Sequence, residues 1–410
     1  MPDPVIRPRN GVLLIALQSA EGVAATPSPS TDAVPFEDGS VSFNSPYHTE
    51  QSNEASGSLV SAAPLVVGQP ATISFRSRLK GAGAGATYSA SVKPPLHAAL
   101  QAAGMRGQFT AAVSAAALTA GTTNSGTLGT GFASTAQQYR GMPLILSGGP
   151  GAGRMPLITD YSASKVALLS DLYGTALSTA TMAALPGNWS YAGTSPADDA
   201  ARATDHPAAT IYWYEDGNLY QWIDCRATVD FDGNSARPGM GAFSFTGVFM
   251  GRSAAAVPAA IIANHSAPLL VQGTGLPPAM QVNRRGLAIS RWSLSNGGNI
   301  ESPEDPNTSF GYGAGQIGGR TPVFEADPLA TLVSTRDILA EIAAFSQYPI
   351  ALQFGSVAGN RVSLLVPQAQ PVEASPTDRG SFRAETTRWQ GVSPGKDAYG
   401  RDGDRVLTFS

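Results

Sequence analysis

Histidine, cysteine and clustered carboxylates are the side chains that most often do chemistry near neutral pH, and this sequence offers few of them. Its histidines, His48, His97, His206 and His265, are scattered, and none has the spacing of a metal-binding pair. The only cysteine, Cys225, falls on the apolar face of an expected strand. We interpret it as a small buried hydrophobic residue, and a lone cysteine excludes an intrachain disulfide.

Three motifs approach known binding loops without completing them. Residues 230–234 read Asp-Phe-Asp-Gly-Asn, like the start of a calcium loop, but the closing glutamate is missing. Glycine runs at 81–85 and 148–151 lack the lysine–hydroxyl pair of a phosphate-binding loop. No Gly-x-Ser-x-Gly elbow presents a nucleophile. We therefore expect no catalytic residue, no metal ion, no cofactor and no enzymatic activity.

Five acidic residues stand in expected loops without an evident partner, and we expect them to be solvated. They are Asp160, Asp171, Asp198, Asp199 and Asp205. Bulk charge also gives no argument for a binding site: the net charge is −4 and only 14% of residues are charged. Such a chain is not built for tight binding to nucleic acid or an anionic membrane.

The clearest strand-forming segment runs from Pro207 to Gly251. Thr210–Tyr214 and Leu219–Ile223 flank an Asp-Gly turn, the strongest short-range hairpin signal. A third strand alternates, with Cys225, Ala227, Val229 and Phe231 on one face. A fourth places Phe243 and Phe245 together. This pattern predicts a four-stranded antiparallel meander with one apolar face.

The remaining chain predicts a mainly β protein with two short helices, at 94–104 and at 334–345 with Ser334 as N-cap. Strands are expected at 40–43 and 71–78, with a long polar loop at 48–61 between them. The apolar run 11–17 is interpreted as an ordinary structured segment, because no cleavage site follows it. No run approaches the ~20 apolar residues of a membrane span.

The order of these signals occurs twice. A strand at 286–294, a polar loop at 296–320, Pro322–Phe324, a helix, a hairpin and a closing strand at 380–383 repeat the earlier series. Tandem duplication therefore predicts a first domain of residues 1–105 plus 206–252 and a second domain of 279–410. Residues 106–205, rich in Ala, Gly, Thr and Ser, form an inserted β module, and 253–278 form a linker.

The string Ile211–Gly251 resembles the tail tube proteins of long-tailed bacteriophages, in which an aromatic hairpin leads through a Pro-Gly turn to a strand ending near Phe-x-Gly. Pro64–Met105 and Leu13–Phe36 are similar to the same family. The insertion and the second hairpin, which lacks the aromatic cluster, depart from it. The resemblance implies two tail-tube-type β-sandwich domains, each flanked by a short helix, with the insertion on the tube exterior.

The same resemblance implies a function. Stacked rings would form the conduit for DNA ejection, in the virion tail, from protein made in the host cytoplasm. Two domains per chain predict a homotrimeric ring with pseudo-six-fold symmetry. The implied partners are other copies, the tape measure, tail terminator and distal tail proteins, and DNA that passes without sequence-specific binding. The bore is expected to be mainly acidic or neutral, and the long loops to become ordered on ring stacking.

Two alternatives stay open. The first is another β-rich tail component, such as a tail-tip or baseplate ring protein or a decoration protein. The second is a carbohydrate-binding β-sandwich, with exposed aromatic side chains as a sugar platform. The residues that would form that platform are Tyr212, Tyr214, Tyr220 and Trp222.

Overall fold

The computed structural model describes residues 5–410 apart from 8, 56, 58, 263–266, 272–278 and 309. Within these residues 44% are in strands and 5% are in three short helices, so the predicted mainly β fold is confirmed. None of these helices has the length and apolar character that crossing a membrane requires.

The helices are α1 (His97–Ala102), α2 (Asp199–Asp205) and α3 (Ile338–Ala343). The predicted extent of the last one is wrong, because it begins four residues after Ser334. Asp337 is its N-cap: its carboxylate accepts a hydrogen bond from the N–H of Ala340. An aspartate in this position satisfies an N–H that otherwise has no partner at a helix start.

The strands fall into three groups along the chain. Before and after the predicted insertion lie β1 (Gly11–Leu17), β2 (Ser42–Phe43), β3 (Tyr47–Glu50), β4 (Leu65–Gly68), β5 (Ala71–Arg78), β15 (Ala209–Glu215), β16 (Asn218–Asn234) and β17 (Met240–Ala254). Between them lie β6 (Met105–Thr110), β7 (Val113–Ala117), β8 (Ala120–Gly121), β9 (Ser125–Thr127), β10 (Ile145–Ser147), β11 (Ile158–Tyr161), β12 (Val166–Leu169), β13 (Met182–Leu185) and β14 (Asn188–Gly193). The last group is β18 (Met280–Val282), β19 (Arg285–Gly286), β20 (Arg291–Ser295), β21 (Ile300–Glu301), β22 (Gln316–Ile317), β23 (Val323–Ala326), β24 (Tyr348–Val357), β25 (Asn360–Arg379), β26 (Phe382–Gly391) and β27 (Val406–Phe409).

One 16-stranded sheet connects the two ends of the chain, and the same strand order occurs in it twice. The first repeat is β2-β5-β17-β16-β15-β1, and the second repeat is β20-β23-β26-β25-β24-β18. Each strand of one repeat has a counterpart in the other in the same chain order. The two repeats are joined where the distal end of β16 pairs with β20, at Phe231 opposite Leu294.

The predicted second and third strands of the meander are a single strand, β16, so the four-strand prediction is wrong in this detail. An irregularity between Ile223 and Arg226, with Asp224 at a φ of 55°, keeps the strand paired while shifting its register. Such a bulge adds a residue without ending the ladder. The predicted apolar face is confirmed: Cys225, Ala227 and the two residues that alternate after them are buried.

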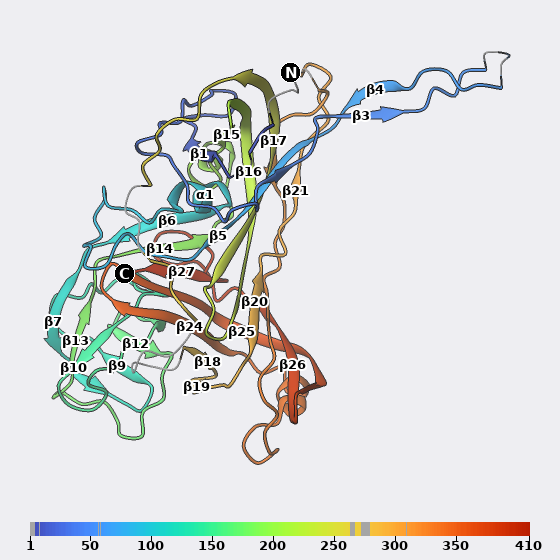
Figure 1. Ribbon diagram of the computed structural model, residues 1–410. Coiled ribbons are helices and arrows are strands. Elements are labelled where there is room, and N and C mark those ends of the chain that lie inside the picture. The colour runs from blue at the N-terminus through green and yellow to red at the C-terminus, as the bar shows by residue number, and fades with distance from the viewer. Residues whose placement is uncertain are drawn as a thin grey trace.

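The inserted segment has a core of its own. Its strands β7–β13 form a three-stranded and a four-stranded sheet around a cluster that includes Leu118, Tyr161 and Leu185. Strands β6 and β14, at its two ends, pair with each other in the large sheet, where β14 also pairs with β27. In Figure 1 this segment lies to one side of the body, away from the long strands of β16, β17 and β26.

Two long hairpin segments leave the sheet at matching places. The first arm, the described residues of 47–68 with β3 and β4, projects away from the body (Figure 1). The second arm, the described residues of 296–320 with β21 and β22, runs back along the long strands of the first repeat toward the base of the first arm. Equivalent segments of the two repeats are therefore placed differently, one free and one packed.

Candidate functional site

The histidines singled out in the sequence do not meet in the described part of the chain. His97 on α1 is half-buried, with Nδ1 2.8 Å from the Tyr191 hydroxyl and Nε2 2.8 Å from the Gln101 amide. Burial, assisted by Lys93, lowers the pKa of His97 from 6.5 to about 3. His48 lies exposed on the first arm, and His265 lies outside the described residues.

Cys225 and the calcium-like loop have structural surroundings. The Cys225 side chain is fully buried, and this burial raises the pKa of its thiol. Asp230 accepts hydrogen bonds from the Asn296 N–H at 2.7 Å and the Ser295 hydroxyl at 3.1 Å, while Asp232 pairs with Arg76. Across the described residues, no group of three histidine, cysteine or acidic side chains could hold a metal ion.

The prediction that the loop acids are solvated is wrong for two of them. Asp171 is buried where the inserted segment meets the second repeat, and it accepts a hydrogen bond from Gln281 at 2.8 Å. This burial raises the pKa of its carboxyl group. Asp205 is also buried and forms an ion pair with Arg106. Both partners are remote in sequence, so no local pattern could reveal them.

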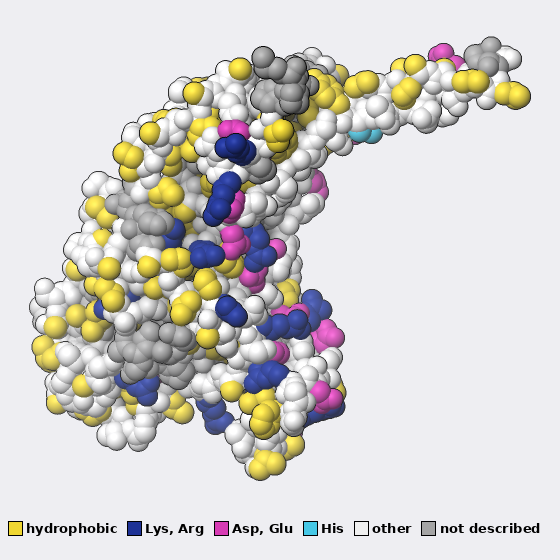
Figure 2. Space-filling view, in the orientation of Figure 1, with side chains coloured by type: hydrophobic (Ala, Val, Ile, Leu, Met, Phe, Trp, Pro, Cys, Tyr) yellow, Lys and Arg dark blue, Asp and Glu magenta, His cyan; other side chains and the backbone are white. Residues whose placement is uncertain are grey.

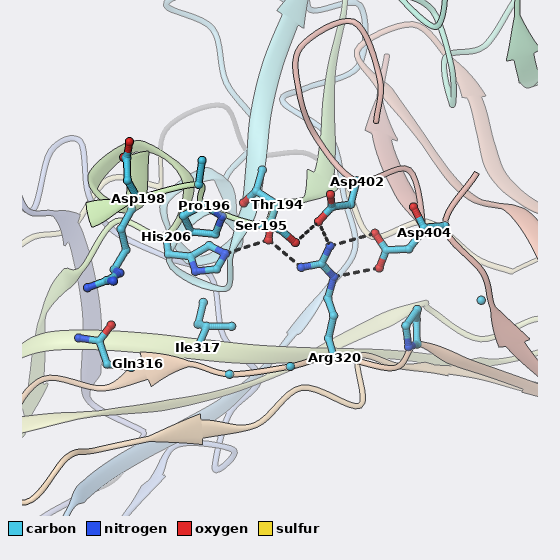
Figure 3. Close-up of a pocket in the computed structure, with 17 residues that line it drawn as sticks. Thr194, Ser195, Pro196, Asp198, His206, Gln316, Ile317, Arg320, Asp402 and Asp404 are labelled. Atoms are coloured by element: carbon cyan, nitrogen blue, oxygen red, sulfur yellow. Dashed lines mark hydrogen bonds and ion pairs between the residues drawn. The ribbon is translucent and has the colours of Figure 1, made fainter. Parts of the chain in front are cut away.

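A polar pocket of about 640 Å³ lies between the end of the insertion, the second arm and the C-terminal segment. Figure 3 shows Arg320 pointing between Asp402 and Asp404, with its Nε 3.0 Å from Asp404 Oδ2. Burial alone would lower the pKa of Arg320, but the two carboxylates outweigh it and raise that pKa. Arg320 also donates to the Thr194 carbonyl oxygen at 2.7 Å.

The pocket is better suited to holding segments together than to catalysis. His206 lies 3.0 Å from the same Thr194 oxygen, and burial lowers its pKa, so it is neutral near pH 7. The Ser195 hydroxyl donates to Asp402 at 2.6 Å. The polar groups around Arg320 thus form hydrogen bonds or ion pairs that join different segments of the chain. A satisfied network of this kind fixes a unique arrangement of the segments that it joins.

The solvent-facing side of the large sheet carries ion pairs across both repeats, and we call it the polar face. Arg76 donates from Nη2 to both carboxylate oxygens of Asp232, at 2.7 and 2.8 Å. In the second repeat, Arg388 lies 3.1 Å from Glu373 and 3.9 Å from Glu325. Figure 2 shows charges of both signs interspersed on the visible surface. The arginines of this face are therefore paired with acids, and its charges are balanced.

The second arm is held to the first repeat by specific contacts. The Gly315 carbonyl oxygen accepts a hydrogen bond from Arg226 at 2.6 Å, and Arg226 also forms an ion pair with Glu21 at 2.9 Å. A Cβ on Gly315 would lie 2.3 Å from the Thr246 oxygen, so only glycine fits so close to the strand. Phe310 contacts Tyr47 at the base of the first arm, with ring centroids 5.2 Å apart.

The first arm extends beyond its contact with Phe310. Its strands pair with each other, and apolar side chains along it, including Leu59, Leu65 and Val66, are exposed. Figure 2 shows hydrophobic side chains along the arm to its tip. Exposed apolar groups on an extended hairpin are typical of a segment that contacts another molecule. Chain pattern identified this long loop but not which of the two arms would be free.

Comparison with known protein families and with curated protein sequences finds no match to this chain.

Proposed function

We propose that the chain is the structural subunit of a bacteriophage tail tube, which assembles into stacked rings that conduct DNA during genome ejection. In this proposal the two repeats are tail-tube-type β-sandwich domains, flanked by α1 and α3, and the inserted module lies on the tube exterior. The subunit is made in the host cytoplasm and is located in the virion tail.

The observation that carries the proposal is the doubled strand order in one continuous sheet. The junction of β16 with β20 already extends the sheet from one repeat to the next. At the ends of this series, β2 and the distal half of β25 have no second partner strand in the described residues. A sheet that continues from copy to copy and closes on itself removes such edges, which are otherwise prone to aggregate.

Ring closure by three chains follows from two repeats per chain, if each ring has six repeats as the family resemblance implies. The partners are then other copies of the chain within and between rings. The tape measure, tail terminator and distal tail proteins would contact the tube inside and at its ends. The balanced charges of the polar face support a bore through which DNA passes without being held.

A tail-tip or baseplate ring protein would use the same edges, and the alternatives differ in how far stacking continues. The carbohydrate-binding alternative has less support, because Trp222 is fully buried beneath Phe249 and Phe43 and cannot serve an exposed sugar platform.

Negative-stain electron microscopy of the purified chain tests the proposal. We expect hollow tubes of stacked rings, and native mass determination of a single ring should give three chains. Single rings that never stack would favour the tail-tip alternative. A chain that stays monomeric at every concentration and salt condition would contradict the proposal, and rings of six chains would contradict the trimer.

A further inference from the structure

The junction between the two repeats is a template for a second junction that the single chain leaves open. The match between repeats can be anchored at their cores. Phe245 of β17 lies opposite Ile73 of β5, and both are buried. Trp389 of β26 lies opposite Phe324 of β23 in the same way. Strand pairing then carries this match outward to the edges.

On one side the match reaches the distal strands. Gly241 pairs with Phe231, and its counterpart Glu385 pairs with Pro376. Phe231 of the first repeat therefore corresponds to Pro376 of the second. The environments differ: Phe231 is 1% exposed and Pro376 is exposed, as is Val372 nearby on β25. The second repeat thus presents an open edge where the first is covered.

On the other side the match reaches β2 and β20, which stand first in the strand order of each repeat. Ile73 pairs with Phe43 of β2, and Phe324 pairs with Leu294 of β20. Leu294 is the residue that lies opposite Phe231 within the chain. Its counterpart Phe43 is partly exposed, at 39%. Strand β20 covers the distal end of β16, and its counterpart β2 has one free edge in the described residues.

We propose that the distal half of β25 (372–379) binds β2 of a second copy of this chain, with Pro376 opposite Phe43 and Thr377 opposite Ser42. The inference rests on the proposed ring function and names the strands and the register of its interchain contact. It continues the established pairing of β16 with β20, so every chain offers one donor edge and one acceptor edge. Contacts of this head-to-tail kind generate closed rings when the rotation permits.

The backbone of β25 is directed suitably for this contact. The Glu385 N–H donates to the Pro328 carbonyl oxygen at 2.9 Å, on the side of β26 away from β25. Its partner Pro376 therefore points its carbonyl group away from β26, toward the free edge. The backbone N–H and C=O groups of Ala374 and Asp378, two residues away, point the same way. Proline lacks an N–H, so this junction has one donor fewer. Proline on an open edge also disfavours indiscriminate strand pairing.

The first arm is placed by the same match. Within the chain, the second arm begins where the Asn296 N–H donates to Asp230 on the polar face of β16. The corresponding residues are Ser45 and Ser375. The first arm of the second copy would then begin over Ser375 and run along β25, within a ring. This differs from the expectation that both arms become ordered between stacked rings.

Cysteine cross-linking tests the register. Ser42 and Thr377 would form a non-hydrogen-bonded antiparallel pair, whose Cα atoms lie about 4.5 Å apart, within disulfide reach. The S42C/T377C double variant should give chains linked by disulfides, up to covalent trimers, on non-reducing gels after assembly. Native Cys225 can stay, because it is buried.

Two matched pairs provide controls. D232C/S293C joins the equivalent residues within the chain, which lie opposite each other, and should oxidise in monomers. S42C/S375C is two residues out of register, and diagonal neighbours about 7–8 Å apart should cross-link about tenfold less.

The outcomes separate this inference from the proposed function. Tubes that form normally, with the intrachain control oxidised and no S42C/T377C cross-link, would overturn the register while leaving the tube function intact. Absence of any assembly would overturn both. As a second variant, V372K should block ring formation, and V357K, at another exposed valine, should not. Normal rings from V372K would contradict the proposed edge.

Discussion

The two repeats have the same strand order and opposite degrees of coverage. In the first, the distal strand β16 is covered by β20 and the helix α1 is covered by neighbouring strands, so that Leu100 is 0% exposed. In the second, the distal half of β25 is open and Leu339 on α3 is 67% exposed. Strands of the same chain thus cover the first repeat, whereas the corresponding surfaces of the second repeat are exposed in the single chain.

The two arms also differ in coverage, but here the arm of the second repeat is the covered one. The second arm is fixed on the first repeat through Arg226, and the first arm extends into solvent. Each repeat therefore has one covered feature and one exposed feature. These are β16 and the first arm in the first repeat, and the second arm and the distal half of β25 in the second. A series of units that each cover the next and are covered by the previous one is the logic of a head-to-tail ring.

The largest test of this contrast compares equivalent residues on the distal strands. Phe231→Ala should lower the free energy of unfolding by about 3–5 kcal/mol, because a fully buried aromatic side chain leaves a cavity. Pro376→Ala should change it by less than about 0.5 kcal/mol in the monomer, since the site is exposed. Chemical denaturation below the assembly concentration measures both. Comparable losses would show that the repeats are equally covered.

The helices allow a second comparison of similar kind. Leu100→Ala on α1 should cost about 2–4 kcal/mol, as expected for a buried leucine. Leu339→Ala on α3 should leave monomer stability within about 0.5 kcal/mol. Thermal unfolding of the two variants, followed by circular dichroism, gives the values. A destabilising Leu339→Ala would mean that the part of α3 around Leu339, and not only Ile338, is covered already in the single chain.

The sequence predicted the buried face and the repeated order better than it predicted which repeat is covered. Alternation identified the buried face from Cys225 to Phe231, and the repeated order of signals predicted two units. The coverage of Phe231 depends on Leu294, which is 63 residues away along the chain and is brought near only by pairing of β16 with β20. Patterns with periods of two or four residues carry no information about such contacts.

The polar pocket was missed for a related reason. Arg320 and its two carboxylates, Asp402 and Asp404, come from the second arm and the C-terminal segment. No spacing in the sequence marks them as a group. The density of acids and arginines between 397 and 405 was the one available signal. Salt-bridged networks that depend on tertiary contacts become visible only in the folded chain.

Acid provides a third way to separate the repeats, because the second, residues 279–410, contains no histidine. The pKa of His97 is lowered from 6.5 to about 3 in the folded state. Below pH 6.5, His97 binds a proton in the unfolded chain but not in the folded chain. The free energy of unfolding therefore falls as the pH drops from 6.5 toward 3. The slope due to His97 is at most about 1.4 kcal/mol per pH unit.

His97→Gln should flatten that slope between pH 6.5 and 4 in denaturation curves recorded as a function of pH. His48→Gln is the matched control, because His48 is exposed on the first arm. Hydrogen exchange should show that amides of α1 and β14 lose protection before those of β24 and β25. Earlier loss in the second repeat would contradict this account of acid sensitivity.

The smallest effects are expected on the polar face, where both repeats are exposed alike. The Arg76–Asp232 and Arg388–Glu373 pairs are partly solvated, so Asp232→Asn and Glu373→Gln should each cost less than about 1 kcal/mol. Each change nevertheless removes the nearer acid of an arginine: Arg76 loses Asp232, and Arg388 keeps only Glu325 at 3.9 Å. If this face lines the bore, assembled tubes of the double variant should retain DNA in a salt-dependent way, unlike the parent tubes. Filter retention of labelled DNA at increasing salt measures this, with Glu54→Gln on the first arm as the control. Equal retention by parent, control and double variant would place the polar face away from the bore, and the free edges would then have to close the ring with the opposite curvature.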